Sequence, residues 1–336
     1  MLQVGVMHMR LHPSKVSRMY EFAAVAKMEG VELFYFSPGK VNFETKTIRG
    51  YVYRNGSWKK KNFDFPKVVI NMVAPITDKQ SKIYYELRKC VIFTESSIGG
   101  KDSIHDILKD TKFKAYLPQT KVASNVTTVM KFLGKHKKIA LKPMRGCKGV
   151  GVIFIEKNAG DYTVYDMELQ YNQVDLKCYL KRLDLSKHVM QEFIVSETKD
   201  GLPVDYRIHT QKNGEGKHVL TTIYPRIACI KNKVTNYSQG GYTIDIDTFL
   251  NHQFNSRDKE LKHMMEVIAI ELSRTIDKYY DFSLNELGID IGLTKDNKVY
   301  IYEVNWRPGA PVIFSGELNH AKNLIEYCKY KSKNLN

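Results

Sequence analysis

The sequence of 336 residues lacks a long apolar run and lacks a secretory leader. A membrane-spanning helix needs about 20 consecutive apolar residues, and no stretch of the sequence comes near that length. The first residues, MLQVGVMHMR, read as a β-strand and lack the charged, apolar and small segments of a secretion signal. We therefore expect a cytoplasmic protein without a membrane span.

Cysteine is scarce and scattered along the chain. The five cysteines are Cys90, Cys147, Cys178, Cys229 and Cys328. None forms a CxxC pair, which argues against a zinc knuckle and against a dithiol redox site. In a cytoplasmic protein we expect these thiols to be reduced and mostly buried.

Several common nucleotide-binding and catalytic motifs are also missing. The sequence has no GxxxxGK[ST] P-loop, and its glycine-rich stretch lacks the strand-to-helix setting of a dinucleotide fingerprint. We find no convincing nucleophilic triad, internal repeat, low-complexity tract or long linker. Neither the P-loop nor the dinucleotide-binding fingerprint therefore applies to this sequence.

Positive charge, in contrast, is abundant. Lysine and arginine number 52 against 36 acidic residues, which gives a formal net charge of +16. Such an excess attracts polyanions of any kind, including acidic peptides, anionic polymers and nucleotide phosphates. Two interpretations stay open: a generally solvated basic surface, or a dedicated polyanionic partner such as an acidic peptide or polymer. We recognise no nucleic-acid module and expect no specific nucleic-acid partner.

Residues 1–98 have the pattern of an α/β domain. Gln3–Met7 alternates like a short strand, and Pro13 with Ser14 is expected to open a helix. VELFYF is the next strand, and this β-α-β order favours a parallel sheet. Asn55-Gly56 marks the turn of a hairpin.

The pattern changes at Gly99, and residues 99–330 are expected to form a second domain. Its first lobe (99–190) contains the strand KIALKP and the glycine-rich stretch RGCKGVGV, and its second lobe (191–330) contains a long helix and a terminal hairpin. The predicted fold class is therefore α/β, with α+β character in the C-terminal part.

The strongest chemical signal is the hairpin LGIDIGLTKDNKVYIYEVN. Glu303 and Asn305 are two residues apart on a strand and share one face, to which Asp290 of the other strand can turn. Two carboxylates and an amide are hard oxygen ligands of the kind that magnesium prefers. The competing interpretation is an edge hairpin with one solvated face. We favour the metal site, because buried carboxylates without a cation would be costly.

Two weaker signals precede this hairpin. Lys142 ends a strand and is followed by glycines that could close over a phosphate, although glycine-rich turns are common. The segment QEFI at residues 191–194 could offer backbone groups to an adenine ring between two lobes, although an ordinary core strand has the same pattern.

The order of these segments carries a resemblance to a known family. Lys142, the glycine-rich stretch, QEFI, DYR, NYSQGG and finally Asp290 with EVN resemble the ATP-grasp superfamily, from about Gly99 to Pro311. Within it, YLPQT and EVNWRPG are similar to segments of the YheC/YheD-type, spore-coat-associated ATP-grasp proteins. The resemblance implies a two-lobed ATP-grasp fold preceded by an α/β domain.

The resemblance also implies a role for individual residues. It assigns phosphate contacts to Lys142 and, less directly, to Lys101, and a mobile lid to Arg145, Gly146, Gly149 and Gly151. The adenine hinge would be Gln191, Glu192, Phe193 and Ile194, and the ribose would meet Asp205 or Glu197. Arg207 and Arg226 would face the phosphates, Asn236 would support phosphate and metal, and Arg307 would bind the substrate carboxylate. Asp290, Glu303 and Asn305 would hold one or two Mg²⁺ ions.

The implied activity is that of an ATP- and magnesium-dependent ligase. ATP converts a carboxylate into an acyl phosphate, which an amine then attacks, with an amino acid, an acidic peptide or a polymer as substrate. Three alternatives stay open: an ATP-grasp phosphotransferase, a non-catalytic ATP-binding protein of the spore coat or a surface, and a charge-driven nucleic-acid binder. The subgroup implies spore association, and the oligomeric state is not predicted.

Overall fold

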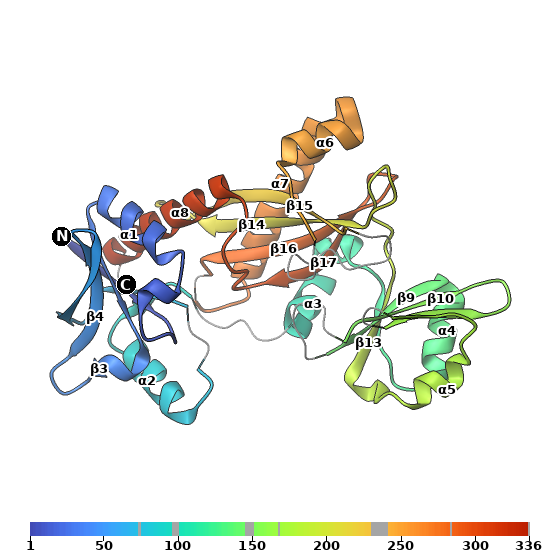
Figure 1. Cartoon of the computed structure of the whole chain (residues 1–336), viewed down its shortest axis with the longest axis horizontal. Helices are drawn as coiled ribbons and strands as arrows, with labels where there is room; N and C mark the ends of the chain where they lie inside the picture. Colours follow the sequence, from blue (N-terminus) through green and yellow to red (C-terminus); the bar gives the residue numbers. More distant parts are fainter. Residues whose placement is uncertain are drawn as a thin grey trace.

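The computed structural model describes residues 1–72, 75–95, 101–144, 151–166, 169–229, 241–282 and 284–334, with the backbone alone at residues 101–103 and 314. The described elements form three sheets. Figure 1 shows these sheets along the long axis of the molecule, with β4 at one end, β14–β17 in the middle and β9, β10 and β13 at the other end. Mixed α/β architecture is therefore confirmed.

The first sheet lies within residues 1–98, for which an N-terminal α/β domain was predicted. Its strands are β1 (Leu2–Met7), β2 (Val31–Phe36), β3 (Val41–Asn42), β4 (Thr47–Arg54), β5 (Ser57–Asp64), β6 (Val68–Asn71) and β7 (Ile92–Phe93), in the order β3-β4-β2-β1-β6-β7 with β5 on β4. Its helices are η1 (Pro13–Lys15), α1 (Met19–Met28), η2 (Pro38–Lys40) and α2 (Asp78–Arg88). Strand β1 pairs in parallel with β2 and β6, as the β-α-β order predicted. Strand β4 pairs antiparallel with β2, β3 and β5, so the sheet as a whole is mixed.

The start of the first helix was predicted wrongly. Pro13 and Ser14 form only a short 3₁₀ turn, which ends where Val16 takes an extended conformation (φ −128°, ψ 95°), and α1 begins at Met19. Proline at the first position of a turn is compatible with either helix type, so the sequence pattern could not separate the two.

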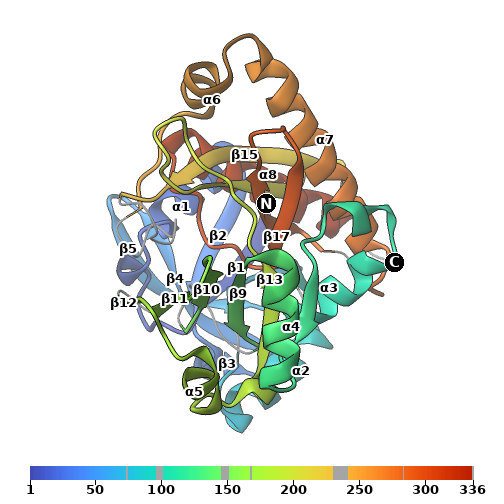
Figure 2. The ribbon, with the colours of Figure 1, turned by 90° about the vertical axis from the view of Figure 1, so that its right-hand side faces the viewer.

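The second sheet comes from residues 120–192, which overlap the segment predicted as the first lobe (99–190). Its strands are β8 (Thr120–Val122), β9 (Lys138–Pro143), β10 (Ile153–Lys157), β11 (Tyr162–Asp166), β12 (Leu169–Tyr171) and β13 (His188–Glu192), in the order β12-β11-β10-β9-β13-β8. Its helices are α4 (Val126–His136), α5 (Leu176–Lys181) and η4 (Leu185–Lys187). All of its recorded pairings are antiparallel, and Figure 2 shows α4 against β13 and β9.

The third sheet has the order β15-β14-β16-β17 and contains the predicted hairpin. Its strands are β14 (Val204–Lys212), β15 (His218–Ile227), β16 (Glu286–Leu293) and β17 (Val299–Asn305). The helices near it are α3 (Lys101–Lys109), η3 (Lys112–Tyr116), α6 (Ile246–Phe254), η6 (Asn255–Arg257) and α7 (Asp258–Asp277). Ile289 and Ile291 of β16 share a core with Leu272 of α7, so this face of the sheet is apolar and the opposite face can be polar.

The last helix, α8 (Phe314–Lys333), returns to the first sheet. Ala321, Leu324 and Ile325 share a core with Val4 of β1, and Figure 1 shows α8 beside α1. None of the helices in the described ranges is long and apolar enough to cross a membrane. The expectation of mostly buried cysteines was wrong for the described residues: Cys90, Cys178 and Cys229 are exposed, and Cys328 is buried.

Candidate active site

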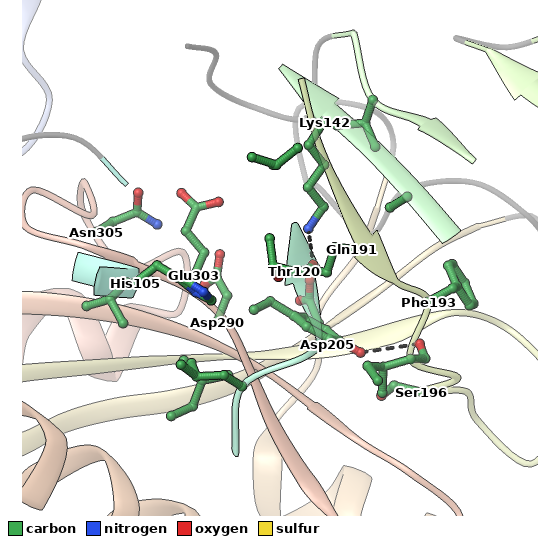
Figure 3. Close-up of a pocket in the computed structure, with 18 of the residues that line it drawn as sticks. His105, Thr120, Lys142, Gln191, Phe193, Ser196, Asp205, Asp290, Glu303 and Asn305 are labelled. Atoms are coloured by element: carbon green, nitrogen blue, oxygen red, sulfur yellow. Dashed lines mark hydrogen bonds between the residues drawn. The ribbon is translucent and has the colours of Figure 1, made fainter. Parts of the chain in front are cut away.

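A cavity of about 1040 Å³ lies between the second and third sheets. A volume of this size is typical of small-molecule sites, which hold ligands in about 300–1,000 Å³. Figure 3 shows Lys142 and Gln191 on the second-sheet side, and Asp205, Asp290 and Glu303 on the third-sheet side. The cavity is lined by the predicted residues Lys142, Gln191, Glu192, Phe193, Ile194, Glu197, Asp205, Arg207, Arg226, Asp290, Glu303, Asn305 and Arg307.

The remaining predicted residues are placed only in part. Arg145, Gly146, Gly149 and Asn236 lie outside the described residues. Lys101 is the first residue of α3, and only its backbone is described. Gly151 follows the predicted lid with φ +75°, and a Cβ there would stand 3.1 Å from Cγ of Pro143, so glycine suits this position.

The lysine of the second sheet is held by its neighbours. Lys142 lies on β9, and its Nζ donates a hydrogen bond to Oε1 of Gln191 on β13 at 2.6 Å. The amide Nε2 of Gln191 in turn donates to Oγ1 of Thr120 on β8 at 3.0 Å (Figure 3). This chain across three adjacent strands fixes the ammonium group at the cavity wall, so Gln191 positions a cation there.

An aromatic wall adjoins this lysine. Phe193 follows β13, and its ring meets that of Phe154 edge to face at 5.5 Å between centroids. Nζ of Lys138 lies 4.5 Å from the centroid of the Phe193 ring, a cation–π distance. A flat ring such as adenine could pack against such a wall.

The carboxylate of Glu192 contacts the segment before β8 and helix α4. Its Oε1 accepts a hydrogen bond from the backbone N–H of Gln119 at 2.9 Å, and its Oε2 lies 3.1 Å from Nδ1 of His136. The backbone N–H groups of Glu192 and Phe193 donate to the carbonyls of Gln119 and Lys138. These contacts anchor the predicted hinge segment to the strands and helix of the second sheet.

On the third sheet, four charged side chains form one network. Arg207 donates to both carboxylate oxygens of Asp290, at 2.9 Å for the Nη2–Oδ2 pair. Arg226 donates to both oxygens of Asp205, at 2.6 and 2.8 Å, and its Nη2 also lies 3.0 Å from Oδ2 of Asp290. Asp205 and Asp290 are buried, at 8% and 6% relative exposure, so the arginines offset a large desolvation cost.

This network follows from the strand register. Asp205 faces Arg226 across β14–β15, and Arg207 faces Asp290 across β14–β16. Burial alone disfavours the charged form of Arg226, but the carboxylates of Asp205 and Asp290 raise its pKa above the ordinary arginine value. Arg226 is therefore a permanent cation that joins both aspartates. The Asp205 carboxylate, predicted to meet a ribose, is bound to this arginine.

The predicted metal ligands lie on adjacent strands. Asp290 faces Glu303 across β16–β17, and Asn305 faces Gly288. All three predicted ligands line the cavity (Figure 3), and two carboxylates with an amide oxygen are a hard donor set of the kind that Mg²⁺ prefers. Both oxygens of Asp290 also bind arginines, so a metal ion would share this carboxylate with Arg207 and Arg226. In the described ranges, no group of three or more His, Cys, Asp or Glu side chains could hold a metal, so the amide of Asn305 would complete any site here.

Arg307 differs from the other two arginines of the cavity. It has no ion pair within 4.0 Å recorded among the described residues, whereas Arg207 and Arg226 bind carboxylates. Its guanidinium carbon lies 4.1 Å from the centroid of the Trp306 ring. Burial lowers the pKa of Arg307, and the neighbouring Glu95 opposes this effect. A substrate anion could therefore bind the guanidinium of Arg307 without displacing a carboxylate of the described residues, unlike those of Arg207 and Arg226.

Sequence reasoning missed Tyr302. The β16–β17 register shifts between Asp290 and Ile291, so Tyr302 is an extra residue on β17 and lines the cavity next to Glu303. Its hydroxyl lies 3.5 Å from the carbonyl oxygen of Ile194, and burial raises its pKa. A Cβ at Gly292 would stand 1.9 Å from this hydroxyl, which explains the glycine in GIDIGLT. The bulge itself has no signal in the sequence.

Comparison with known proteins agrees with this geometry. The sequence model described as "YheC/D like ATP-grasp" matches residues 90–330. The chain is 26% identical over 322 residues to the endospore coat-associated protein YheD of Bacillus subtilis (strain 168), covering 89% of this chain and 70% of YheD. It is 24% identical over 354 residues to the endospore coat-associated protein YheC of the same strain, covering 98% of this chain and 96% of YheC.

Solved structures share the fold at low sequence identity. The ATP-grasp ligase PsnB, in complex with its precursor peptide PsnA2 and AMPPNP, has a TM-score of 0.57 and 12% identity, with 98% of each chain covered. At this identity the likeness establishes the ATP-grasp fold alone.

Proposed function

The chain belongs to the YheC/D-like ATP-grasp family, and from this premise we propose that it is a ligase that uses ATP and Mg²⁺ to join a carboxylate to an amine. One observation carries the proposal. Lys142 from one sheet and Asp290, Glu303 and Asn305 from another line a single cavity of about 1040 Å³. Phosphoryl transfer needs such a combination of cations and metal ligands around the phosphates.

The proposed roles follow from the contacts. Gln191 accepts a hydrogen bond of 2.6 Å from the Lys142 ammonium. The ammonium is therefore already positioned when phosphate oxygens bind, which lowers the entropic cost of binding. The wall formed by Phe193 and Phe154 receives the adenine ring. When bound, Mg²⁺ on Glu303, Asn305 and Asp290 would neutralise charge on the phosphates during transfer.

The reaction needs two steps. An oxygen of the substrate carboxylate attacks the γ-phosphorus of ATP, the bond to the β–γ bridging oxygen breaks, and ADP leaves. The amine nitrogen then attacks the acyl carbon, phosphate leaves with the bonding electron pair, and the nitrogen loses a proton. Arg307 would bind the substrate carboxylate, and Arg207 and Arg226 would lie close to the phosphoryl group during its transfer.

Nucleotide turnover tests the proposal. Purified protein with Mg²⁺ and ATP is incubated with pools of amino acids and acidic peptides, and ADP and phosphate release are measured. We expect release that depends on both a carboxylate and an amine, and that is lost in Glu303→Ala. Failure of the protein to bind ATP would contradict the proposal.

A second candidate is an ATP-binding protein of the spore coat that does not turn over substrate. It is favoured by the names of YheC and YheD, both endospore coat-associated, which also lead us to propose spore association for this chain. ATP binding without ADP release in any substrate pool, while Glu303→Ala binds ATP more weakly, would favour this candidate. A phosphotransferase would release ADP with a phosphorylated acceptor and no amide product.

A further inference from the structure

The hairpin of β4 and β5 presents an open strand edge. Strand β5 spans Ser57–Asp64, and β4 is its only recorded partner among the described strands. Figure 2 shows β5 at the outer edge of the first sheet. An open edge offers its backbone N–H and C=O groups to any additional extended chain.

The turn determines which groups face outward. Asn55 and Gly56 both have positive φ, +49° and +76°, as a two-residue type I′ turn requires. The closing pair Arg54–Ser57 is then a hydrogen-bonded pair, and hydrogen-bonded and non-hydrogen-bonded pairs alternate along the ladder from there. Trp58, Lys60 and Asn62 stand in non-hydrogen-bonded pairs with β4. Trp58, Lys60 and Asn62 therefore direct their backbone N–H and C=O groups toward the open edge.

The same residues border an aromatic surface. The Trp58 ring lies 5.1 Å from that of Tyr53 and 5.7 Å from that of Tyr20 on α1. Tyr20 and Tyr53 stay 45% and 38% exposed, although their rings pack together at 5.6 Å. Three exposed or half-buried rings that pack on one another form a preformed, rigid surface, which costs little conformational entropy on binding.

Cations accompany this surface. Lys59, Lys60 and Lys61 are consecutive and exposed on β5. Arg49 of β4 joins Lys60, Lys61 and Asn62 in lining a shallow hollow of about 330 Å³. Among the described residues, the lining of this hollow contains three cations and the neutral Asn62, and no acidic residue.

We propose that β5 and this hollow, the β5 surface, dock an acidic peptide as an additional extended strand. Lysines on an edge strand also protect it from aggregation, but that role requires neither the hollow nor the aromatic surface. A peptide can pair with the outward groups of Trp58, Lys60 and Asn62, while its carboxylates meet the lysines. A nucleic acid could use the charge and the rings but not the backbone pairing, so the edge favours a peptide.

The position of this surface suggests its use. The β5 surface belongs to the first sheet, whereas the cavity is lined by residues of the second and third sheets. An acidic chain long enough to reach from β5 to the cavity would be held there at an effective concentration set by the length of its free segment. Docking itself requires neither ATP nor the ligase activity, so it is tested without nucleotide.

The test uses fluorescence anisotropy of a labelled peptide of alternating glutamate and threonine. We expect the triple variant Lys59→Glu, Lys60→Glu and Lys61→Glu to bind it at least about 10-fold more weakly, because opposed charges become like charges. The matched control reverses three exposed lysines on other elements: Lys131→Glu, Lys259→Glu and Lys295→Glu. It changes the net charge equally and is expected to alter binding by less than about 3-fold.

Backbone pairing is tested separately with Asn62→Pro. Proline is tolerated at outward positions of an edge strand, and here it removes one outward N–H while leaving every lysine in place. We expect weaker peptide binding and unchanged binding of a single-stranded oligonucleotide of equal charge. Equal weakening by both lysine triples, unchanged peptide binding in Asn62→Pro, or tighter binding of the oligonucleotide than of the peptide would each overturn the proposal. Far-ultraviolet circular dichroism checks that each variant is folded.

Discussion

Asp290 faces Glu303 across the β16–β17 ladder, while its own carboxylate is ion-paired with arginines of β14 and β15. Two carboxylates opposite each other on adjacent strands repel. Arg226 divides its hydrogen-bond donors between Asp290 and Asp205. A divalent cation bound by Asp290 and Glu303 would add positive charge between these two carboxylates, and this arrangement motivates the first prediction.

Replacing Glu303 with glutamine is expected to reduce ATP turnover by at least about 100-fold, since even partners outside the metal shell cost about 10- to 100-fold. The amide keeps the shape of the side chain and removes the charge that a metal requires. ADP release by the two proteins measures the turnover, and calorimetry at several Mg²⁺ concentrations measures the magnesium dependence of nucleotide binding. We expect the variant to need more Mg²⁺ than the wild type.

The control for this prediction is Asp296→Asn. Asp296 is exposed in the turn of the same hairpin, so the substitution makes the same chemical change outside the cavity. It should leave Mg²⁺ dependence unchanged. If both variants lost nucleotide binding equally, the loss would come from the hairpin fold and the proposed metal role of Glu303 would be wrong.

The bond between Lys142 and Gln191 predicts a graded effect on nucleotide affinity. Lys142→Met removes a charged donor, and such hydrogen bonds contribute about 1.5–3 kcal/mol, so ATP should bind about 10- to 100-fold more weakly. Gln191→Met removes only the group that positions the ammonium, 2.6 Å away, and should weaken binding less. Affinity measured with a non-hydrolysable ATP analogue checks both variants. A larger loss in Gln191→Met would show that Gln191 contacts the nucleotide itself.

Parts of this site were predictable because they depend on local pattern. Alternation placed Glu303 and Asn305 on one face of a strand, and the turn between the two apolar strands predicted the hairpin that brings Asp290 to the same side. In the structure Asp290 faces Glu303, and Asn305 faces Gly288. The parallel pairing of β1 with β2 and the hairpin at Asn55-Gly56 were likewise predicted and are confirmed.

Other features depend on pairings between distant segments. The hydrogen bonds that link Lys142, Gln191 and Thr120 exist because β13 pairs with both β9 and β8. The sequence does not show which strands will be neighbours in this sheet. The Asp205–Arg226 pair requires the register of β14 and β15. The bulge at Tyr302 adds one residue to β17 and so interrupts the simple alternation of faces along this strand. Each is a tertiary relationship, and local propensity carries no information about it.

Arg226 is expected to be essential for stability as well as for the site. Arg226→Met leaves two buried carboxylates, Asp205 and Asp290, with one arginine between them, and breaking a buried pair in this way costs about 3–5 kcal/mol. Denaturation in guanidinium chloride, followed by circular dichroism, measures this loss. The double variant Asp205→Asn with Arg226→Met should recover part of it, because Asp290 keeps its pair with Arg207 and the charge of Asp205, which lost its arginine, is removed. No recovery would mean that packing of the guanidinium, rather than its charge, matters.

The last prediction concerns acid stability. Asp277 at the end of α7 accepts a hydrogen bond from Nζ of Lys212 at 2.6 Å and lies 3.6 Å from Nε2 of His218. Although burial alone would raise its pKa, the partners His218 and Lys212 lower the pKa of Asp277 to about 2. The folded state therefore keeps this carboxylate charged at pH values where the unfolded chain protonates it.

The sign of the effect follows from linkage. Because the folded pKa is depressed, the stabilisation is fully present above about pH 4 and is lost as the pH falls through about 2. Asparagine resembles the protonated carboxyl, so Asp277→Asn should cost about 2 kcal/mol near neutral pH and progressively less in acid. Urea unfolding of both proteins across this pH range measures the difference. If the difference in unfolding free energy between the two proteins stayed constant between about pH 7 and about pH 2, the charge of Asp277 would not be the cause, because an effect of charge disappears when the carboxylate is protonated. The side chain would then act through its shape.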